Sequence, residues 1–430
     1  LLSLNNDEQA YTALGNASRL ISYDVALWLD LARAAKRLGK TDDMIHCYRC
    51  ALAIDPNQTE VWNNLGIMLL DKKQFNEALT CCREAVARNP TAITFNNLGA
   101  VLLRMRKPDE AIGIFERATE LNPGMLDAYR GQFVTAMYLP WEGDTLERKI
   151  INFGTQVAKS IAPFDEAWEM PINSERSLRI GYLSSDFRRH PVSYNMLPVL
   201  AQHDRTRHEV YIYADIERPD EVTERVNSLA TAWRDIKGMT DEAAAHLIRQ
   251  DQIDILVVLA WRFDRNRPFI AAYRAAPVQV SYHDPGTCGI EAMDYLITDT
   301  VLTPKHSTEL FSEQPIRLPT YYLHEPIESA PDPLPPPNLQ VDHITFGCFN
   351  NAAKIGPDII RIWAQVLKMV PNSRFYLKYN NIYAETETRQ RYIDWFTKEG
   401  VESERLEFHT TTDFRDAHLR HYGKVDIALD

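Results

Sequence analysis

A segment of the sequence recurs at intervals of 34 and 33 residues, and this periodicity restricts the fold more than any other feature. Trp28-Leu-Asp-Leu-Ala32 returns as WNNLG from residue 62 and as FNNLG from residue 95. Each unit also contains a later alanine (51, 85, 118) that is followed five positions on by a proline (56, 90, 123). Small residues let paired helices approach each other, and proline ends the second helix because it lacks the N–H that a helix interior needs. Each unit is therefore predicted to be a helix-turn-helix hairpin.

This pattern of an aromatic residue, two small residues and a terminal proline resembles the tetratricopeptide repeat. Three units are clear, and residues 7–21 are typical of the second helix of a fourth unit. We expect residues 1–128 to form an α-solenoid, because repeats of this kind stack into a superhelix. Its concave face suits extended peptides, so protein substrates are the expected partners. Pairing of two copies of the chain through the repeats, to give a homodimer, is a further alternative.

One polar position of the repeat is a candidate for peptide binding. Asp30, Asn64 and Asn97 occupy the same place in successive units and are expected to form a ladder. An asparagine amide offers both a donor and an acceptor, so it can hold a peptide backbone without reading side chains. The spacing equally allows an alternative in which these are ordinary solvent-facing polar residues.

Composition excludes several classes of function. The chain is 45% apolar and 25% charged, and it has no apolar run of the about 20 residues that cross a bilayer, so no membrane partner is expected. A net charge of −12 argues against nucleic-acid binding, although Arg262, Arg265 and Arg267 form a local basic cluster that is open to a small anionic ligand. Six cysteines in so long a chain indicate no disulfide framework, and a reducing, cytoplasmic location fits best. Cys47 and Cys50 have C-x-x-C spacing, but without further ligands we expect helix packing and no metal.

After residue 128 the pattern changes twice. Residues 129–176 are predicted to be a helical connector. From Ser177, strands alternate with helices such as 241–250, which predicts a parallel, doubly wound sheet in a first Rossmann-like lobe over residues 177–328. The predicted strands are 178–184, 209–214, 253–260, 278–282 and 295–298.

A proline-rich stretch, SAPDPLPPPN, suits a linker between domains, assigned to residues 329–341. A second alternating series over residues 342–430 predicts another lobe, with strands at 344–348, 374–379, 405–408 and 425–429 and helices at 358–369, 386–398 and 414–421. Two Rossmann-like lobes imply a ligand cleft at the carboxyl ends of their strands. The G-x-G-x-x-G fingerprint and the P-loop are both missing, which disfavours nicotinamide and ATP chemistry.

Four motifs, in order along the chain, give this region a family resemblance. They are LRIGYLSSDFRRHPVS (178–193), APVQVSYHDPGTCG (276–289), MDYLITD (293–299) and FNNAAKI (349–355). Together with the repeats they resemble the O-linked N-acetylglucosamine transferase family. The resemblance covers essentially the whole chain and implies two lobes of the GT-B type, the second incomplete.

The resemblance implies a glycosyltransferase that moves N-acetylglucosamine from a UDP donor to Ser or Thr of proteins, with inversion. His190 matches the family's active-site histidine, and Lys354 its diphosphate-contacting lysine, so that no metal or other cofactor is expected. Asn351 would bind the nucleotide, and the turn at Gly286 and Thr287 would approach the nucleotide sugar. The alternatives are a surface histidine, a solvated lysine at a helix start and an ordinary turn.

Several residues depart from the family pattern. His283-Asp284 stands where the family often has Gly-Tyr, and LAWRF (259–263) lacks an expected Gly and Thr. The donor sugar is therefore less certain than the fold, and two other functions stay open: a protein-interaction scaffold with an inactive transferase region, or a transferase that uses another nucleotide sugar or a non-protein acceptor. The sequence stops at Asp430, where the family continues into a Gly- and Thr-rich loop and a helix that holds the diphosphate. We therefore expect the 430-residue chain alone to transfer sugar poorly or not at all.

Overall fold

The computed structural model describes residues 7–139, 145–164, 176–261, 266–324, 330–379, 382–410 and 415–429. Within these ranges the chain divides into two compact units, Leu1–Glu325 and Pro326–Asp430. Each unit is described by itself. No helix in the described part of the chain is long and apolar enough to cross a membrane.

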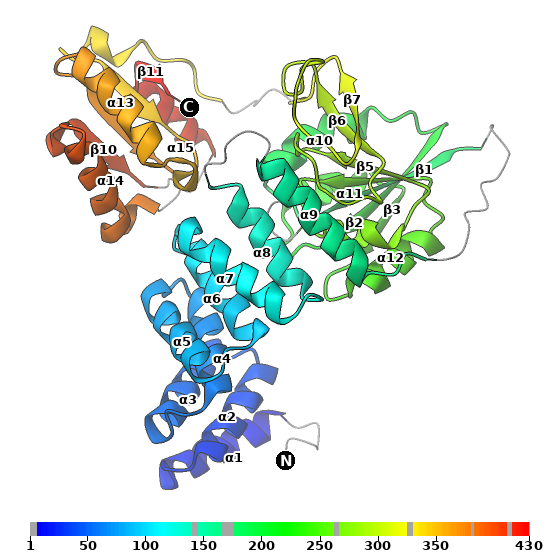
Figure 1. Cartoon of the computed structure of the whole chain (residues 1–430), viewed down its shortest axis with the longest axis vertical. Helices are drawn as coiled ribbons and strands as arrows, with labels where there is room; N and C mark the ends of the chain where they lie inside the picture. Colours follow the sequence, from blue (N-terminus) through cyan, green and yellow to red (C-terminus); the bar gives the residue numbers. More distant parts are fainter. Residues whose placement is uncertain are drawn as a thin grey trace. The chain divides into compact units, whose positions relative to one another are not determined.

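The N-terminal part of the first unit is a stack of helical hairpins (Figure 1). The three predicted hairpins and the second helix of a fourth are confirmed: α1 Asp7–Leu20, α2 Val25–Arg37, α3 Thr41–Ile54, α4 Thr59–Asp71, α5 Phe75–Arg88, α6 Ala92–Arg104 and α7 Pro108–Leu121. The small residues hold the helices close together, since a Cβ added to Gly66 would lie only 2.6 Å from Cys82 Sγ.

The repeat cysteines are packing residues. All six cysteines of the chain have free thiols, and burial raises the pKa of Cys47 and Cys82 to about 12. No group of three or more potential metal ligands occurs among the described residues.

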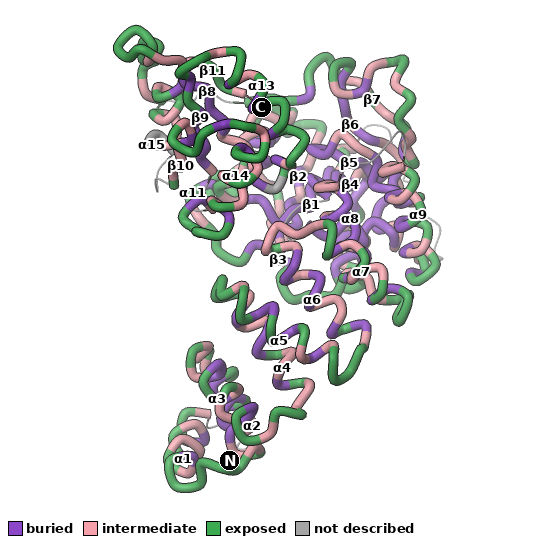
Figure 2. Tube along the Cα trace, turned by 60° about the vertical axis from the view of Figure 1, so that its left-hand side comes forward, coloured by how far each residue is buried: buried purple, intermediate pink, exposed green. Residues whose placement is uncertain are grey.

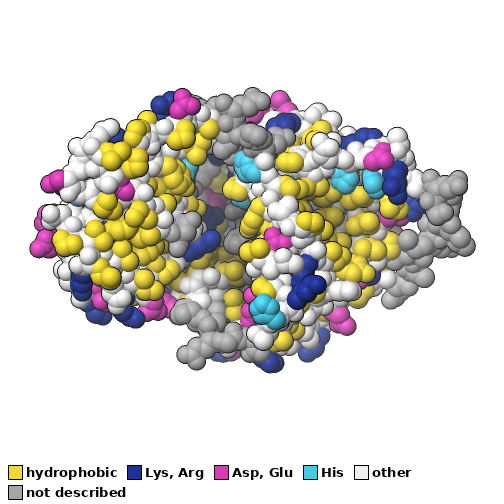
Figure 3. All heavy atoms as spheres, turned by 90° about the horizontal axis from the view of Figure 1, so that it is seen from above, with side chains coloured by type: hydrophobic (Ala, Val, Ile, Leu, Met, Phe, Trp, Pro, Cys, Tyr) yellow, Lys and Arg dark blue, Asp and Glu magenta, His cyan; other side chains and the backbone are white. Residues whose placement is uncertain are grey.

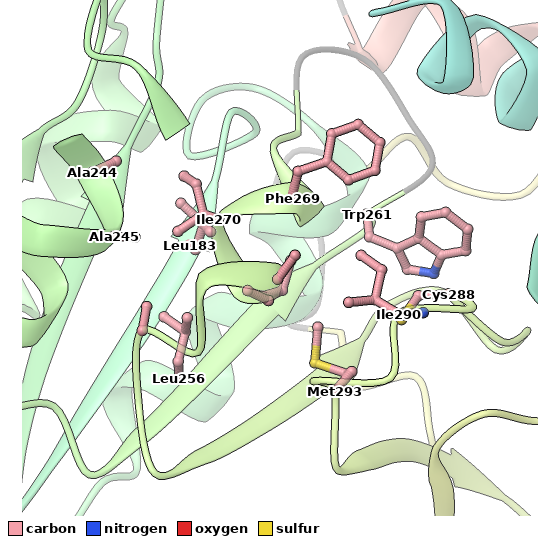
Figure 4. Close-up of a cluster of buried hydrophobic side chains, with 14 of the residues drawn as sticks. Leu183, Ala244, Ala245, Leu256, Trp261, Phe269, Ile270, Cys288, Ile290 and Met293 are labelled. Atoms are coloured by element: carbon pink, nitrogen blue, oxygen red, sulfur yellow. Dashed lines mark hydrogen bonds between the residues drawn. The ribbon is translucent and has the colours of Figure 1, made fainter. Parts of the chain in front are cut away.

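Two further helices join the repeats to the first lobe. These are α8 Leu126–Ala136, which packs on α7, and α9 Thr145–Ser160. Phe133 of α8 lies at the centre of an aromatic cluster, with ring centroids 5.3 Å from both Phe153 of α9 and Trp261 of the lobe. One hydrophobic core, part of which is drawn in Figure 4, therefore joins α8 and α9 to the first lobe.

The first lobe contains a parallel seven-stranded sheet of order β3-β2-β1-β4-β5-β6-β7. Its strands are β1 Leu178–Ser184, β2 His208–Ala214, β3 Ala232–Asp235, β4 Ile255–Leu259, β5 Val278–Tyr282, β6 Tyr295–Asp299 and β7 Gln314–Leu318. Its helices are α10 Pro191–Ala201, α11 Glu221–Ser228, α12 Asp241–Gln250 and the short η2 Pro268–Tyr273. Buried residues concentrate along the central strands (Figure 2). The five predicted strands are confirmed, whereas β3 and β7 were not predicted.

The second unit has a parallel four-stranded sheet of order β10-β9-β8-β11. Its elements are β8 Thr345–Cys348, α13 Pro357–Met369, β9 Arg374–Lys378, α14 Thr386–Lys398, β10 Leu406–His409, α15 Arg415–Arg420 and β11 Ile427–Ala428. Every strand and helix predicted in this region is present, within a few residues at the ends. Hydrophobic side chains also gather on the outside of this unit (Figure 3), and the exposed ones include Leu334, Leu339, Ile359, Ile362 and Met369.

Candidate active-site residues

His190 lies beyond the carboxyl end of β1 and is the residue immediately before α10. Its Nδ1 accepts a hydrogen bond from the backbone N–H of Val192 at 3.4 Å, so the ring is fixed as a helix cap. The same nitrogen lies 3.7 Å from Asp186 Oδ1, and a quarter of the side chain is exposed. Pro191 at the first helical position sets the direction in which the helix leaves the sheet. His190 therefore combines a fixed orientation with access to solvent.

A buried network behind His190 ties β1 to β4. Asn266 Oδ1 accepts hydrogen bonds from Ser184 Oγ at 3.0 Å and the Ser185 N–H at 2.7 Å. Asn266 Nδ2 donates to Asp186 Oδ2 at 2.8 Å and to the carbonyl of Ala260 at 3.0 Å. The network holds the Asp186 carboxylate beside His190. The sequence analysis missed both Asp186 and Asn266; the signal for Asp186 was its place directly after an apolar strand.

The carboxyl end of β5 carries the departure from the family pattern. His283 adopts a left-handed backbone with φ of 61°, and its ring stacks on Tyr282 at 4.1 Å. The side chain is buried, and Nε2 has no hydrogen-bond partner among the described residues. Burial lowers the pKa of His283 to about 4, so the imidazole is neutral at physiological pH. The ring is therefore a neutral group whose buried Nε2 has no described hydrogen-bond partner.

Thr287 has a structural position inside the lobe. Its hydroxyl donates to Glu313 Oε2 at 2.7 Å and accepts from the Ser312 N–H at 3.0 Å. Gly286 beside it is half-buried. The glycine on which the backbone depends is Gly289, with φ of 70° and no room for a Cβ. The predicted contact of Gly286 and Thr287 with a nucleotide sugar stays a prediction.

Arg267, one of the three residues of the predicted basic cluster, is not available to bind an anion. The Arg267 Nε donates to Asp241 Oδ1 at 2.6 Å, and its two terminal nitrogens donate to the carbonyls of Ile236 and Met239. Arg267 is consequently buried and neutralised, which corrects the expectation for this residue. Arg262, Arg265 and Phe263 lie outside the described residues.

Asn351 and Lys354 follow the carboxyl end of β8 in the second unit. The Lys354 N–H donates to the Asn351 carbonyl at 2.9 Å, which places both residues in one short turn before α13. Lys354 is exposed, and no ion pair involving it is found within the described part of the chain. Because His190 and Lys354 belong to different units, the ligand cleft predicted for the two lobes stays a prediction.

A group of rings at the carboxyl ends of β9 and β10 was missed by the sequence analysis. His409 stacks on Tyr376 at 3.9 Å, and the buried Lys378 lies 2.6 Å from His418 Nδ1. Burial lowers the pKa of Lys378, and burial followed by the charge of Lys378 lowers the pKa of His418. Phe349, after β8, stands edge-on to His418 at 5.9 Å. Flat rings beside a cationic group are suited to a planar, phosphorylated ligand.

The three candidate peptide-binding residues have different surroundings. Asn97 Nδ2 donates to Asn63 Oδ1 of the preceding repeat at 2.8 Å. Asn64 is exposed, while Asp30 forms an ion pair with Arg33 of its own helix. A single amide–amide hydrogen bond therefore joins positions 63 and 97 of neighbouring repeats, and peptide binding stays a prediction.

Two Rossmann-like parallel sheets, with polar residues at their carboxyl edges, define the class of two-lobed nucleotide-sugar transferases. A profile of Glycosyl transferase family 41 matches residues 156–325 and 337–430, and tetratricopeptide-repeat profiles match 25–58 and 57–123. The chain belongs to this family, the O-GlcNAc transferase family.

Known relatives agree with that assignment. The chain is 32% identical over 324 residues to the rice protein named probable UDP-N-acetylglucosamine–peptide N-acetylglucosaminyltransferase SPINDLY, with 74% of this chain and 35% of the relative aligned. Its Arabidopsis counterpart is 35% identical over 270 residues, 61% of this chain and 29% of that protein. The chain thus spans about a third of the length of these relatives. A solved structure of a mutant Thermobaculum terrenum O-GlcNAc transferase superposes with a TM-score of 0.81 at 32% identity, covering 99% of this chain and 79% of that one.

Proposed function

We propose that this chain is part of an inverting transferase that moves N-acetylglucosamine from a UDP donor to Ser or Thr hydroxyls of proteins held by the repeats. The observation that carries the proposal is the combination, in one chain of this family, of a repeat array with a sheet edge that presents His190 beside the buried Asp186. The names of the relatives support the donor and the peptide acceptor.

The described side chains suggest how the work would be divided. The acceptor hydroxyl attacks the anomeric carbon from the face opposite the diphosphate, so the bond from that carbon to the phosphate oxygen breaks as the new one forms. His190 would orient the hydroxyl or accept its proton, because a capped imidazole has a fixed direction. Lys354 would stabilise the departing diphosphate with a fixed positive charge and no metal. The rings near Lys378 and His418 would hold the uracil.

The function is tested on protein expressed from the complete gene. It is incubated with labelled nucleotide sugars and a library of Ser- and Thr-containing peptides, and mass spectrometry follows the mass added. Sugar on the peptide hydroxyl supports the proposal. Sugar found only on small acceptors, or peptide binding with no transfer at all, contradicts it and favours one of the two alternatives.

Replacement of Lys354 isolates the charge at the second sheet edge. Lys354→Ala is expected to lower the transfer rate by about a hundredfold or more, the usual effect of removing one group that stabilises transition-state charge. Peptide affinity, measured by fluorescence anisotropy, should not change. The matched control is Lys368→Ala, since Lys368 is an exposed lysine near the other end of α13. Transfer at the unmodified rate in Lys354→Ala would remove this residue from the mechanism.

A further inference from the structure

A pocket of about 830 Å³ lies in the first unit where the repeats meet the lobe. One wall is the turn between α7 and α8 together with the start of α8, including Met125, Leu126 and Arg130. The other wall comes from Asp215, directly after β2, and from residues 237–241, after β3. The volume is within the range of ordinary ligand sites. The pocket therefore opens at the carboxyl edge of the sheet, next to the last helices of the array.

The buried floor of the pocket, formed by Arg267, Asp215 and Asp241, has one negative charge in excess, whereas the acidic and basic residues of the whole lining balance. Arg267, Asp241 and Asp215 have only 9%, 14% and 18% of their side chains exposed. Arg267 is committed to Asp241 and to two backbone carbonyls, as described above. Asp215 Oδ2 lies 3.7 Å from the Arg267 guanidinium, and its carboxylate makes no hydrogen bond to any described residue. Arg267 is a single cation beside two carboxylates, so one negative charge is left over. We assign this charge to Asp215, because its carboxylate oxygens can still accept hydrogen bonds.

The remaining lining suits a long basic side chain. Met125, Leu126 and Met239 supply apolar surface, against which the methylene stem of a lysine or arginine can pack. At the rim, Asp127 and Arg130 pair at 3.6 Å and largely cancel each other. Lys237 is exposed and has no ion-pair partner in the described ranges.

We propose that this pocket binds a lysine or arginine side chain of the acceptor polypeptide, with its charged end on Asp215 and its stem against the methionines. The proposal rests on the proposed protein acceptor, because the pocket is lined both by the last helices of the array and by the carboxyl edge of the sheet. A basic residue at a fixed distance from the modified hydroxyl then becomes a determinant of acceptor choice. Asp215 is a specificity residue and takes no part in the transfer chemistry.

The test uses a set of fluorescein-labelled, Ser-containing peptides of otherwise uncharged sequence, in which a single lysine is placed at each position in turn. Anisotropy titration of the whole chain is expected to show about tenfold tighter binding for lysine than for norleucine at one position. In Asp215→Asn this preference should fall below about twofold, while the norleucine peptide keeps its affinity. Asp127→Asn is the matched control at the rim and should keep the full preference. An unchanged melting temperature shows that Asp215→Asn is folded, and a urea titration repeats that check.

A lysine preference that survives in Asp215→Asn overturns the proposal. So does a preference for glutamate that disappears in Lys237→Ala, because the pocket would then take an acidic side chain. The readout separates this inference from the proposed function. A lysine preference without sugar transfer supports the pocket proposal and contradicts the proposed transferase function. Sugar transfer without a charge preference supports the transferase function and contradicts the pocket proposal.

Discussion

At the scale of single residues, His283 makes the clearest prediction. The folded imidazole has a pKa of about 4, while the unfolded side chain returns to its usual 6.5. Between these values the unfolded state binds the extra proton, so the free energy of unfolding decreases as the pH falls through this window. From about pH 7 to about pH 5 this one group is expected to remove about 2 kcal/mol of stability. Urea unfolding of the first unit, followed at both pH values, measures the loss.

Replacement of His283 measures how much of the pH-dependent loss of stability comes from its imidazole ring. In His283→Gln the pH-dependent loss should shrink by about 2 kcal/mol, because glutamine does not titrate. His306→Gln changes an exposed histidine and should keep the original dependence. If His283→Gln and the unmodified protein lose equal stability, the imidazole is not held neutral by burial.

The residue scale also shows where prediction from sequence ends. His190 and Lys354 could be placed after strands because each lies within a motif that directly follows an apolar run. Asn266 carries no such local signal, since its bonds to Ser184 and Asp186 join residues about 80 positions apart. The left-handed backbone at His283 was equally invisible, because the sequence has a histidine where such a conformation favours glycine.

At the scale of elements, the contact between α9 and the loop after β5 depends on two glycines. A Cβ on Gly154 of α9 would lie 1.8 Å from the Gly289 carbonyl oxygen, which is backbone and cannot swing away. Gly154→Ala is therefore expected to destabilise the first unit by about 3 kcal/mol or more, through forced separation of helix and loop. Gly113→Ala is the matched control in exposed α7, where nothing lies within 4 Å, and should be neutral or stabilising by up to about 1 kcal/mol. Thermal unfolding compares the pair, and equal melting temperatures would contradict the tight contact.

The two strands that were not predicted, β3 and β7, lie at the two edges of the sheet. β3 is four residues long and none of its residues is buried, so it lacks an apolar run. β7 is an edge strand with a proline at its second position and alternating exposure, and Pro315 argues against a strand unless it lies at an edge. The inner strands, buried on both faces, read as continuous apolar runs and were therefore predictable.

At the scale of the whole molecule, the sequence organises its hydrophobic residues into separate cores. The junction core around Phe133 spans α8, α9 and the first lobe, and the second unit has its own core around Phe375 and Phe396. The alternation of strands and helices was enough to predict two lobes. It did not predict that the repeats and the first lobe share one unit, because that depends on the aromatic contacts of Phe133 across more than 100 residues.

Separate cores predict separate unfolding transitions, each sensitive to its own substitutions. Phe133→Ala and Phe396→Ala each remove a buried ring, which costs about 3 to 5 kcal/mol in the unit concerned. In calorimetry, Phe133→Ala should lower the melting temperature of the first unit only. In hydrogen exchange, the same variant should show reduced protection of the repeats near α8. Phe396→Ala should lower only the other transition, because no ring contact of Phe396 leaves the second unit among the described residues. A shift of both transitions by either variant would mean that the two units unfold as one cooperative body, since only a shared interface passes the loss of one core to the other.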